Sequence, residues 1–467
     1  MPRTPSLTTP LKERGRSALS RTDKIPHIVT EVPGPKSRSL FAREQRFISP
    51  GLQTIALKSG LVIERGEGSL LTDVDGNTFI DFSAGVGVAS LGHSHPAYRA
   101  ALHAQLDKVT VGSFTTEIRL ELTELIARLC PGDLSRTQFY SGGAEAAEAS
   151  LRLAKSYTKK YEFLGFWGGF HGKTGGVLGL MGSDWKKGLG PLMPGLSLAP
   201  YADCYRCPFG KTFPECNFFC VDFVREAIEY QTTGQLAALV VEPMQGTAGN
   251  VIPPPGYLAK LKEVAEENGA LLIVDEMLTG FGRTGRLFGC DHDGVIPDIM
   301  LLGKGMGSGY PISAVVSTEE STRAWPFSQP SGSSSSYGGN PLASAAALAT
   351  LQTLLMESLV EKSAQVGAFL LDKLKALGKK YELIGDVRGK GLFIGLDLVK
   401  DRTTKAPLEK EVTERIFQEA LRRGLLLMAY SSRVRINPAL TLSREVAEAG
   451  FNVLDEVFDH VQRKVAV

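Results

Sequence analysis

The chain has 467 residues, of which 43% are hydrophobic and 22% charged, and its formal net charge is only +2. A chain of this length can bury a large core and is expected to divide into more than one domain. The near balance of charge gives no reason to expect a nucleic acid as a partner, and no apolar run approaches the length of a membrane span, so no membrane partner is expected either.

The first two dozen residues, MPRTPSLTTPLKERGRSALSRTDK, are polar, basic and proline-bearing. They lack the apolar core of a signal peptide, and the prolines weaken the amphipathic helix that a transit peptide would need. We therefore predict a flexible tail, or an arm that packs on a partner subunit, over residues 1–45, and a cytoplasmic location.

A glycine pair precedes the first strong helix signal. Gly142 and Gly143 open a run of helix formers from Ala144 to Lys155. The free backbone amides at such a helix start suit a phosphate group, and glycine lets an anion approach the main chain. Many helices begin after glycine, so this signal is weak when taken alone.

Four of the six cysteines lie in one stretch, CYRCPFGKTFPECNFFC, with the spacing C-x2-C-x8-C-x3-C. They are Cys204, Cys207, Cys216 and Cys220. Four thiolates at this spacing could bind zinc. Two disulfides in an oxidising compartment, or four reduced thiols in a cytosol, are the alternatives.

An aspartate follows a segment typical of a buried strand. Apolar residues at helical spacing between 258 and 265 end at Asn268-Gly269, and the apolar run from Ala270 to Val274 then leads into Asp275. Such a helix and strand predict an α/β sheet, in which ligands bind at the carboxyl ends of strands. Asp275 is thus a candidate site residue, although acidic residues in this position often only cap a helix or solvate a loop.

A second buried-strand signature, Ile299 to Leu302, ends in Gly303-Lys304-Gly305. A lysine between glycines at the end of a strand is a poor candidate for a surface residue, and a desolvated lysine is a nucleophile that can form a Schiff base. Dinucleotide binding is excluded because the glycine spacing is not G-x-G-x-x-G and Tyr310-Pro311-Ile312 leads toward another strand. A lysine for an imine, an aspartate for a ring nitrogen and a helix start for a phosphate together indicate pyridoxal phosphate.

At this point the sequence resembles the class III (ω-amino acid type) aminotransferases of fold type I, from about Leu61 to Val461. The motifs that carry the resemblance are DVDGNTFIDFSAGVGVASLGHSHP (73–96), SGGAEAAEASLRLAK (141–155), FHGKT (170–174), VVEPMQG (240–246), DEMLTGFGRTG (275–285), GKGMGSGYP (303–311), SSYGGNPLASAAALA (335–349) and VRINPALT (434–441). The resemblance implies an α/β fold with a mainly parallel seven-stranded sheet in a large domain, and a smaller α+β domain.

The resemblance also implies how the cofactor is bound. Lys304 would form the Schiff base and carry protons, and Asp275 would pair with the pyridine nitrogen. Ser336 would bind the phosphate of the neighbouring subunit's cofactor, which implies a homodimer or a higher homo-oligomer. The remaining cofactor contacts would come from Gly142, Gly143, Ala144, Phe170, His171 and Met277.

For the substrate, the resemblance implies that Arg435 holds a carboxylate with the paired donors of its guanidinium. Arg433 shares its strand face, and a solvated strand arginine is the alternative for either. Several positions depart from the family: Gly142 replaces a serine, Lys173 an arginine, Thr247 a glutamate and Leu278 a glutamine. The expected substrate-binding set is Arg435, Lys173, Val86, Glu242 and Thr247, and no metal is assigned to the site.

We predict four segments: the arm (1–45), the N-terminal part of a small domain (46–94), a large cofactor-binding domain (95–345) and a C-terminal small domain (346–467). In the last, residues 391–400 are expected to form a strand and residues 413–423 a helix. Three functions fit. The first is a ping-pong aminotransferase that moves an amino group from an ω-amino acid or amine to a keto acid such as pyruvate or 2-oxoglutarate. The second is an amino-acid racemase of the same family, and the third a non-catalytic protein that binds pyridoxal phosphate or an amino acid.

Overall fold

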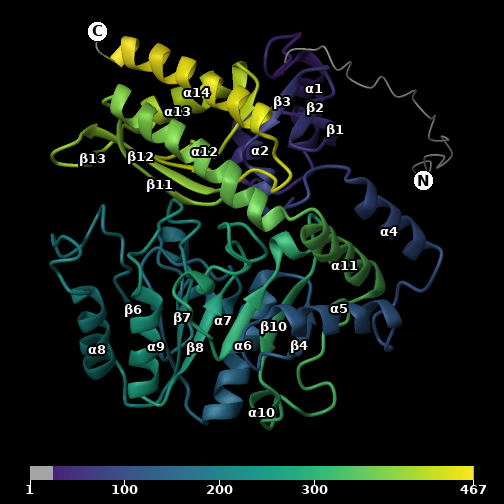
Figure 1. The fold of residues 1–467 in the computed structure, drawn as a ribbon, viewed down its shortest axis with the longest axis vertical. Coiled ribbons are helices and arrows are strands. Elements are labelled where there is room, and N and C mark those ends of the chain that lie inside the picture. The colour runs from purple at the N-terminus through teal and green to yellow at the C-terminus, as the bar shows by residue number, and fades with distance from the viewer. Residues whose placement is uncertain (1–24, 466–467) are drawn as a thin grey trace, which may run out of the picture.

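The computed structural model describes residues 25–465, so most of the expected N-terminal arm lies outside the described part. Within residues 25–45, His27 bridges to Thr78, and α1 (Pro35–Glu44) begins with the amides of Lys36 and Ser37 donating to the carboxylate of Asp75. This part of the chain is therefore attached to the body of the same subunit (Figure 1).

A seven-stranded sheet forms the centre of the lower half of the molecule in Figure 1. All of its strands run the same way except β10, which is antiparallel to both of its neighbours. The predicted α/β fold with a mainly parallel sheet is thus confirmed. In spatial order the strands are β4 (Arg136–Tyr140), β10 (Ser313–Ser317), β9 (Ile299–Leu302), β8 (Leu271–Asp275), β7 (Leu236–Val241), β5 (Glu162–Phe166) and β6 (Leu196–Ala199).

Successive residues of the central strands face two separate cores, because side chains alternate along a strand. In β8, Ile273 belongs to a core with helix α6 (Gly143–Thr158), which contributes mostly alanines there: Ala146, Ala147, Ala149 and Ala154. Leu272 and Val274 belong to the core on the opposite face, with larger side chains of α5 (Glu117–Leu129), α8 (Phe219–Gln231) and α9 (Tyr257–Glu267). Burial on both faces explains why these strands are continuous apolar runs.

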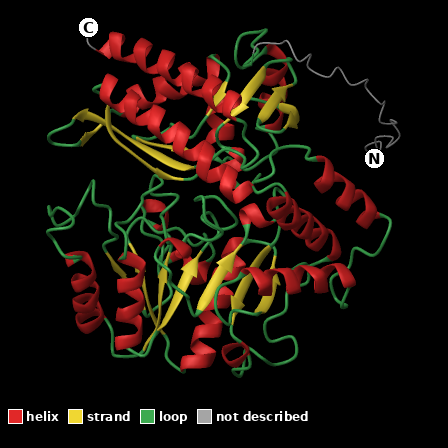
Figure 2. Cartoon of the chain, viewed as in Figure 1, coloured by secondary structure: helices red, strands yellow, loops and turns green. Residues whose placement is uncertain are grey.

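Two smaller sheets lie in the upper half (Figure 2). The first joins β1 (Ile63–Glu67), β2 (Leu70–Asp73) and β3 (Thr78–Asp81) to β14 (Leu425–Leu426), so the N-terminal segment and the C-terminal third share one sheet. The second consists of β11 (Ile384–Lys390), β12 (Phe393–Asp401), β13 (Ala406–Pro407) and β15 (Arg433–Ile436). Three helices lie beside these sheets in the upper half: α12 (Leu359–Lys380), α13 (Lys410–Arg422) and α14 (Arg444–Val465). The expected strand at 391–400 and helix at 413–423 correspond to β12 and α13.

The remaining helices connect these layers. They are α2 (Thr54–Ser59), α3 (Ala84–Gly87), α4 (Pro96–Leu106), α7 (Gly175–Leu178), α10 (Glu319–Thr322) and α11 (Pro341–Met356). Across residues 25–465 no single helix is both long and apolar enough to cross a membrane; α11 and α12 meet that test only together, as a pair bent by 67°.

Candidate active site

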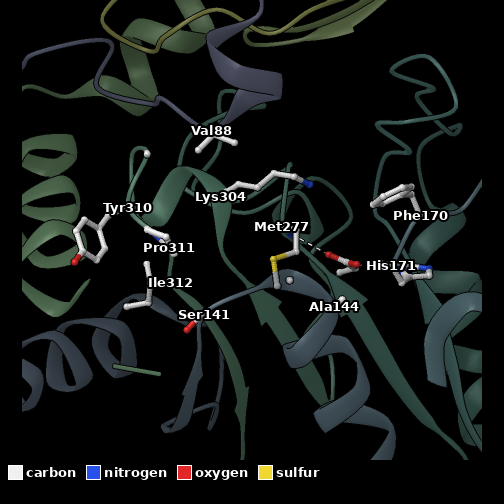
Figure 3. A pocket seen from close by; sticks show the side chains of 14 residues that line it. Val88, Ser141, Ala144, Phe170, His171, Met277, Lys304, Tyr310, Pro311 and Ile312 are labelled. Atoms are coloured by element: carbon white, nitrogen blue, oxygen red, sulfur yellow. Dashed lines mark hydrogen bonds and ion pairs between the residues drawn. The ribbon is translucent and has the colours of Figure 1, made fainter. Parts of the chain in front are cut away.

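Five parallel strands end at the same edge of the large sheet, where α/β proteins bind ligands. The start of α6 follows β4, Phe170 and His171 follow β5, Glu242 follows β7, Asp275 ends β8, and Lys304 follows β9. A cavity of about 310 Å³ lies there (Figure 3). Its walls are Val88, Ser141, Gly143, Ala144, Phe170, His171, Gly172, Asp275, Met277, Lys304, Gly309, Tyr310, Pro311 and Ile312.

Lys304 reaches into this cavity from a tight turn. Its backbone adopts a left-handed conformation with φ of 38°, and Gly303 before it allows Met277 to approach: a Cβ on Gly303 would lie only 2.4 Å from the Met277 sulfur. Burial lowers the pKa of Lys304, which the charge of Arg435 reinforces and the carboxylates of Asp275 and Glu242 oppose. A larger fraction of neutral amine makes Lys304 a better nucleophile.

Asp275 and His171 form a buried pair on the opposite wall. Oδ2 of Asp275 lies 2.8 Å from Nδ1 of His171, and Oδ1 accepts the amide of Met277 at 3.0 Å. Burial acts to lower the pKa of His171, but the hydrogen bond and charge of Asp275 outweigh it, so the pKa is raised. The pair therefore places the Asp275 carboxylate, held by the His171 ring, on this wall of the cavity.

The N-terminus of α6 offers fewer amides than the sequence predicted. Gly143 and Ala144 line the cavity, whereas Gly142 does not. The amides of Ser141 and Gly142 both donate to Oε2 of Glu145, at 2.9 and 2.7 Å. Ser141 also lines the cavity, although the sequence did not predict it as a site residue. Its hydroxyl lies one position before Gly142, which replaces the serine of the related family.

Phe170 lines the cavity, but Lys173 is exposed and does not. The Lys173 ammonium lies 3.7 Å from the ring centroid of Trp185, whose ring meets Phe170 edge-on at 5.5 Å between centroids. Lys173 is thus engaged in a cation–π contact outside the cavity. Its ammonium also lies 5.9 Å from the ring centroid of Phe170, a residue of the cavity wall.

The other expected substrate residues also lie outside the cavity walls. Glu242 is buried behind Phe170: its carboxylate accepts the amides of Phe170 and Gly246, and burial raises its pKa. Thr247 is exposed, and Val86 is half-buried with a left-handed backbone, φ 67°. Val88, two residues further on, lines the cavity in place of Val86.

Ser336 and the two arginines of β15 complete the expected site residues. Ser336 is exposed and does not line the cavity of its own subunit. Of the two arginines on β15, Arg433 pairs with Asp203 at 3.0 Å and donates to the carbonyl of Ala248 at 2.6 Å. Among the described residues, the guanidinium of Arg435 makes one hydrogen bond, to the Tyr430 hydroxyl at 3.2 Å. Arg435 therefore retains most of its donors.

Tyr310, Pro311 and Ile312 also line the cavity, although the sequence did not predict them as site residues. Tyr310 and Pro311 end the GKGMGSGYP segment that contains Lys304, and Ile312 follows it. Their position directly before β10 was the signal that could have placed them in the cavity. Figure 3 shows Tyr310, Pro311 and Ile312 on one side of Lys304, Val88 above it and Phe170 on the other side, beside His171, so apolar side chains line the cavity from several directions.

The four cysteines of the 204–220 loop are free thiols, and all four line one small cavity beside α8. Within residues 25–465, no group of three or more histidine, cysteine or acidic side chains is arranged to hold a metal ion. The described structure therefore gives neither the zinc nor the disulfide interpretation a geometric basis.

Comparison with known proteins agrees with this geometry. The model of the family "Aminotransferase class-III" matches residues 54–458. The chain is 35% identical to the alanine/serine racemase of Pyrococcus horikoshii, covering 95% of each chain, and 33% identical to the 4-aminobutyrate aminotransferase of Mycobacterium leprae, covering 94% of this chain and 99% of that one. A solved amine transaminase from an uncultivated Pseudomonas species, bound to pyridoxal phosphate, superposes with a TM-score of 0.83 at 33% identity, over 89% of this chain and 98% of that one.

The chain belongs to the class III aminotransferase family. It is an enzyme that uses pyridoxal phosphate and acts on small amino and keto compounds, so the hypothesis of a non-catalytic binding protein is set aside. The cavity fits this cofactor: it combines a lysine amine, a buried carboxylate held by histidine and a helix N-terminus with two open amides. When bound, pyridoxal phosphate supplies the electron sink for bonds at the substrate's amino carbon.

Proposed function

We propose that this enzyme transfers an amino group from an ω-amino acid or amine to a keto acid such as pyruvate or 2-oxoglutarate, in two half-reactions of a ping-pong cycle. The observation that carries the proposal is the placement of Lys304 and the Asp275–His171 pair on facing walls of one cavity, with Arg435 near enough to influence the Lys304 amine. This is the arrangement of base, ring anchor and carboxylate binder that transamination requires.

Each residue has a proposed role. Lys304 would hold the cofactor at its aldehyde carbon and would move the proton at the substrate's amino carbon. Asp275 holds a proton on the pyridine nitrogen, and His171 keeps the Asp275 carboxylate in place through the 2.8 Å contact. The amides of Gly143 and Ala144, with the Ser141 hydroxyl, bind the phosphate, and Phe170 and Met277 contact the ring.

We propose that Arg435 binds the carboxylate of the keto acid. Its donors are largely free, whereas those of Arg433 are used by Asp203 and Ala248. Thr247 carries no charge that would cover Arg435, so this arginine stays open in both half-reactions.

For the amino donor, the apolar lining of the cavity supports an amine or a long ω-amino acid more than a short one. Val88, Phe170, Tyr310 and Ile312 present no cation to a distal carboxylate, and Lys173 faces Trp185. A short donor such as 4-aminobutyrate would place its second charge against these apolar side chains, which is costly without a partner.

We propose a homodimer in which Ser336 reaches the neighbouring subunit's cofactor. Large apolar side chains are exposed near Ser336 and on the adjoining segments, notably Phe114, Tyr337 and Met356, each 74% exposed. Large exposed apolar side chains on these segments, before and at the end of α11, are candidates for burial against a second subunit.

Racemisation is the second candidate, because the alanine/serine racemase of Pyrococcus horikoshii is 35% identical over nearly the whole length. Racemisation requires a proton to return on either face of the substrate carbon. Lys304 is the one lysine among the residues that line the described cavity, and that favours delivery on a single face. We therefore rank racemisation below amino transfer.

A single-turnover titration separates the two. The purified enzyme, loaded with pyridoxal phosphate, is mixed with 4-aminobutyrate, a longer ω-amino acid, ornithine, a simple amine, L-alanine or D-alanine while its visible absorbance is followed. Loss of the visible band with one equivalent of aldehyde or keto acid supports amino transfer. A retained band with loss of optical rotation in alanine would overturn it in favour of racemisation.

A further inference from the structure

A buried carboxylate outside the cavity gathers three arginines from three segments. Asp397 on β12 has a side chain that is 1% exposed. Its Oδ1 accepts hydrogen bonds from Nε of Arg206 at 2.9 Å and Nη2 at 2.5 Å. Its Oδ2 accepts no hydrogen bond from the described residues and forms ion pairs at 3.5 Å with Arg388 on β11 and Arg433 on β15. Arg206 lies between Cys204 and Cys207, so the cysteine-rich loop supplies one of the three.

The charges of this cluster balance. Arg433 also pairs with Asp203 at 3.0 Å, and Arg388 pairs with Asp386 at 2.7 Å. Three guanidinium groups thus meet three carboxylates, with Asp397 shared by all three arginines. Among the described residues, removing the charge of this desolvated carboxylate would leave Arg206 without an acidic partner and would leave Arg388 and Arg433 with one acidic partner each.

The same arginines hold the loop that carries Thr247. Arg433 donates to the carbonyl of Ala248 at 2.6 Å, and Arg388 donates to the carbonyls of Gly249 and Asn250 at 2.8 and 3.0 Å. Gly249 has φ of 117°, and a Cβ there would lie 2.7 Å from Cδ of Arg433. The 247–250 loop is therefore packed directly on the arginines of β11 and β15.

Strand register connects the cluster to Arg435. On the β12–β15 ladder, Asp397 lies opposite Arg433, and two residues further Gly395 lies opposite Arg435. Arg433 and Arg435 share one strand face, so a change in the position of Arg433 moves the strand segment that carries Arg435. Arg435 has a single side-chain hydrogen bond among the described residues to hold it independently.

We propose that Asp397 is a positioning residue for substrate carboxylates: through Arg433 and Arg388 it fixes β15, which carries Arg435, against the loop that carries Thr247. The inference rests on the proposed role of Arg435 in carboxylate binding. It assigns to Asp397, Arg388, Arg433 and Arg206 a part in selecting substrates that carry a carboxylate, although none of them lines the cavity.

The test is Asp397→Asn in the holoenzyme, with KM and kcat measured for a keto acid and for a carboxylate-free amine. Misplacement of Arg435 should raise KM for the keto acid about tenfold and leave KM for the amine unchanged. Asp298→Asn is the matched control, because Asp298 forms a partly buried pair with Lys262 at 2.8 Å in the large sheet. It should lower stability without changing the ratio of the two KM values.

Two further variants keep the outcome decisive. If Asp397→Asn does not fold, Arg433→Lys replaces it. This variant keeps the positive charge but loses the paired donors of the guanidinium, and it should raise KM for the keto acid without changing KM for the amine. In an Arg435→Ala background, Asp397→Asn should have no additional effect on the keto acid.

If Arg435→Ala raises KM for the keto acid selectively but Asp397→Asn and Arg433→Lys do not, the role of Asp397 is overturned and the proposed role of Arg435 stands. Equal effects of Arg435→Ala on keto acid and amine would overturn the proposed role of Arg435 and, with it, the inference.

Discussion

Oδ2 of Asp275 lies 2.8 Å from Nδ1 of His171, and both side chains are almost completely removed from solvent. Asp275→Asn removes the charge that would hold the ring proton, and we expect turnover to fall more than in any other variant except those of Lys304. His171→Gln should lower kcat about 10- to 100-fold, the range expected for one hydrogen bond to a charged group. His103→Gln, an exposed histidine on α4, is the control in the same steady-state assay.

Lys304→Ala should abolish turnover and the visible absorbance of the bound cofactor, because the amine that binds its aldehyde carbon is lost. A loss of at least about 1,000-fold is expected when a positioned proton carrier is removed. Lys304→Arg tests whether charge alone suffices, since arginine cannot take the neutral form at neutral pH. Turnover that survives in both variants would remove Lys304 from the reaction.

Gly142→Ser should strengthen binding of pyridoxal phosphate, since a hydroxyl near the phosphate adds a charge-assisted hydrogen bond that contributes about 1.5–3 kcal/mol. A Cβ at Gly142 would meet no atom closer than 3.6 Å, so the change is sterically open. At Gly143 the Met277 sulfur would be 3.3 Å away, and Gly143→Ser should weaken binding instead. Titration of the cofactor-free enzyme gives both dissociation constants, and equal affinities in wild type and Gly142→Ser would contradict the expectation.

Lys173→Met should leave KM for 4-aminobutyrate and for a simple amine within about twofold of wild type, as for a surface position. The reason is the 3.7 Å contact of the ammonium with Trp185, which holds Lys173 away from the cavity. Lys187→Met, in the same stretch of chain, is the control. A selective rise in KM for 4-aminobutyrate would show that Lys173 leaves Trp185 to meet the substrate carboxylate.

Asp81 gives a prediction for stability against pH. Burial acts to raise its pKa, but hydrogen bonds from His93 and Ser83 outweigh burial and lower it below the ordinary 3.8. A carboxylate whose pKa is lower in the folded than in the unfolded chain stabilises the fold at any pH above its unfolded pKa. This contribution is lost as the pH falls through the folded pKa.

Asp81→Asn should therefore lower the free energy of unfolding by about 3 kcal/mol at pH 7, with the difference from wild type shrinking below pH 4. Urea unfolding at pH 7, 5 and 3.5 measures it, and Glu409→Gln, in an exposed pair with Lys400, should leave the midpoint unchanged. A difference independent of pH would mean that Asp81 acts through packing alone.

The central strands were predictable because burial on both faces leaves a local trace in the sequence. Ile299–Leu302 forms β9 as predicted, and the run before Asp275 forms β8. The pairing of β14 with β3 joins residues more than 300 positions apart. No local pattern specifies such a contact.

The residues at the strand ends, Lys304 and Asp275, came from spacing and composition, and they do share one cavity. The five expected substrate residues came from motif positions and lie outside its walls: Arg435, Lys173, Thr247, Glu242 and Val86. Side-chain direction decided the difference: Lys173 prefers the Trp185 ring, and Glu242 prefers two backbone amides. Such preferences depend on neighbours that are distant in sequence.

The alanine-rich face of α6 makes cofactor affinity depend on residues that never touch the cofactor. Small side chains at Ala146, Ala147, Ala149 and Ala154 set how closely the helix axis approaches the sheet. The distance between α6 and the sheet determines where the amides of Gly143 and Ala144 lie relative to Lys304, which follows β9. A single methyl group added at one of these alanines would move the amides of Gly143 and Ala144 away from Lys304. Such a packing defect would be measured first as a higher dissociation constant for pyridoxal phosphate.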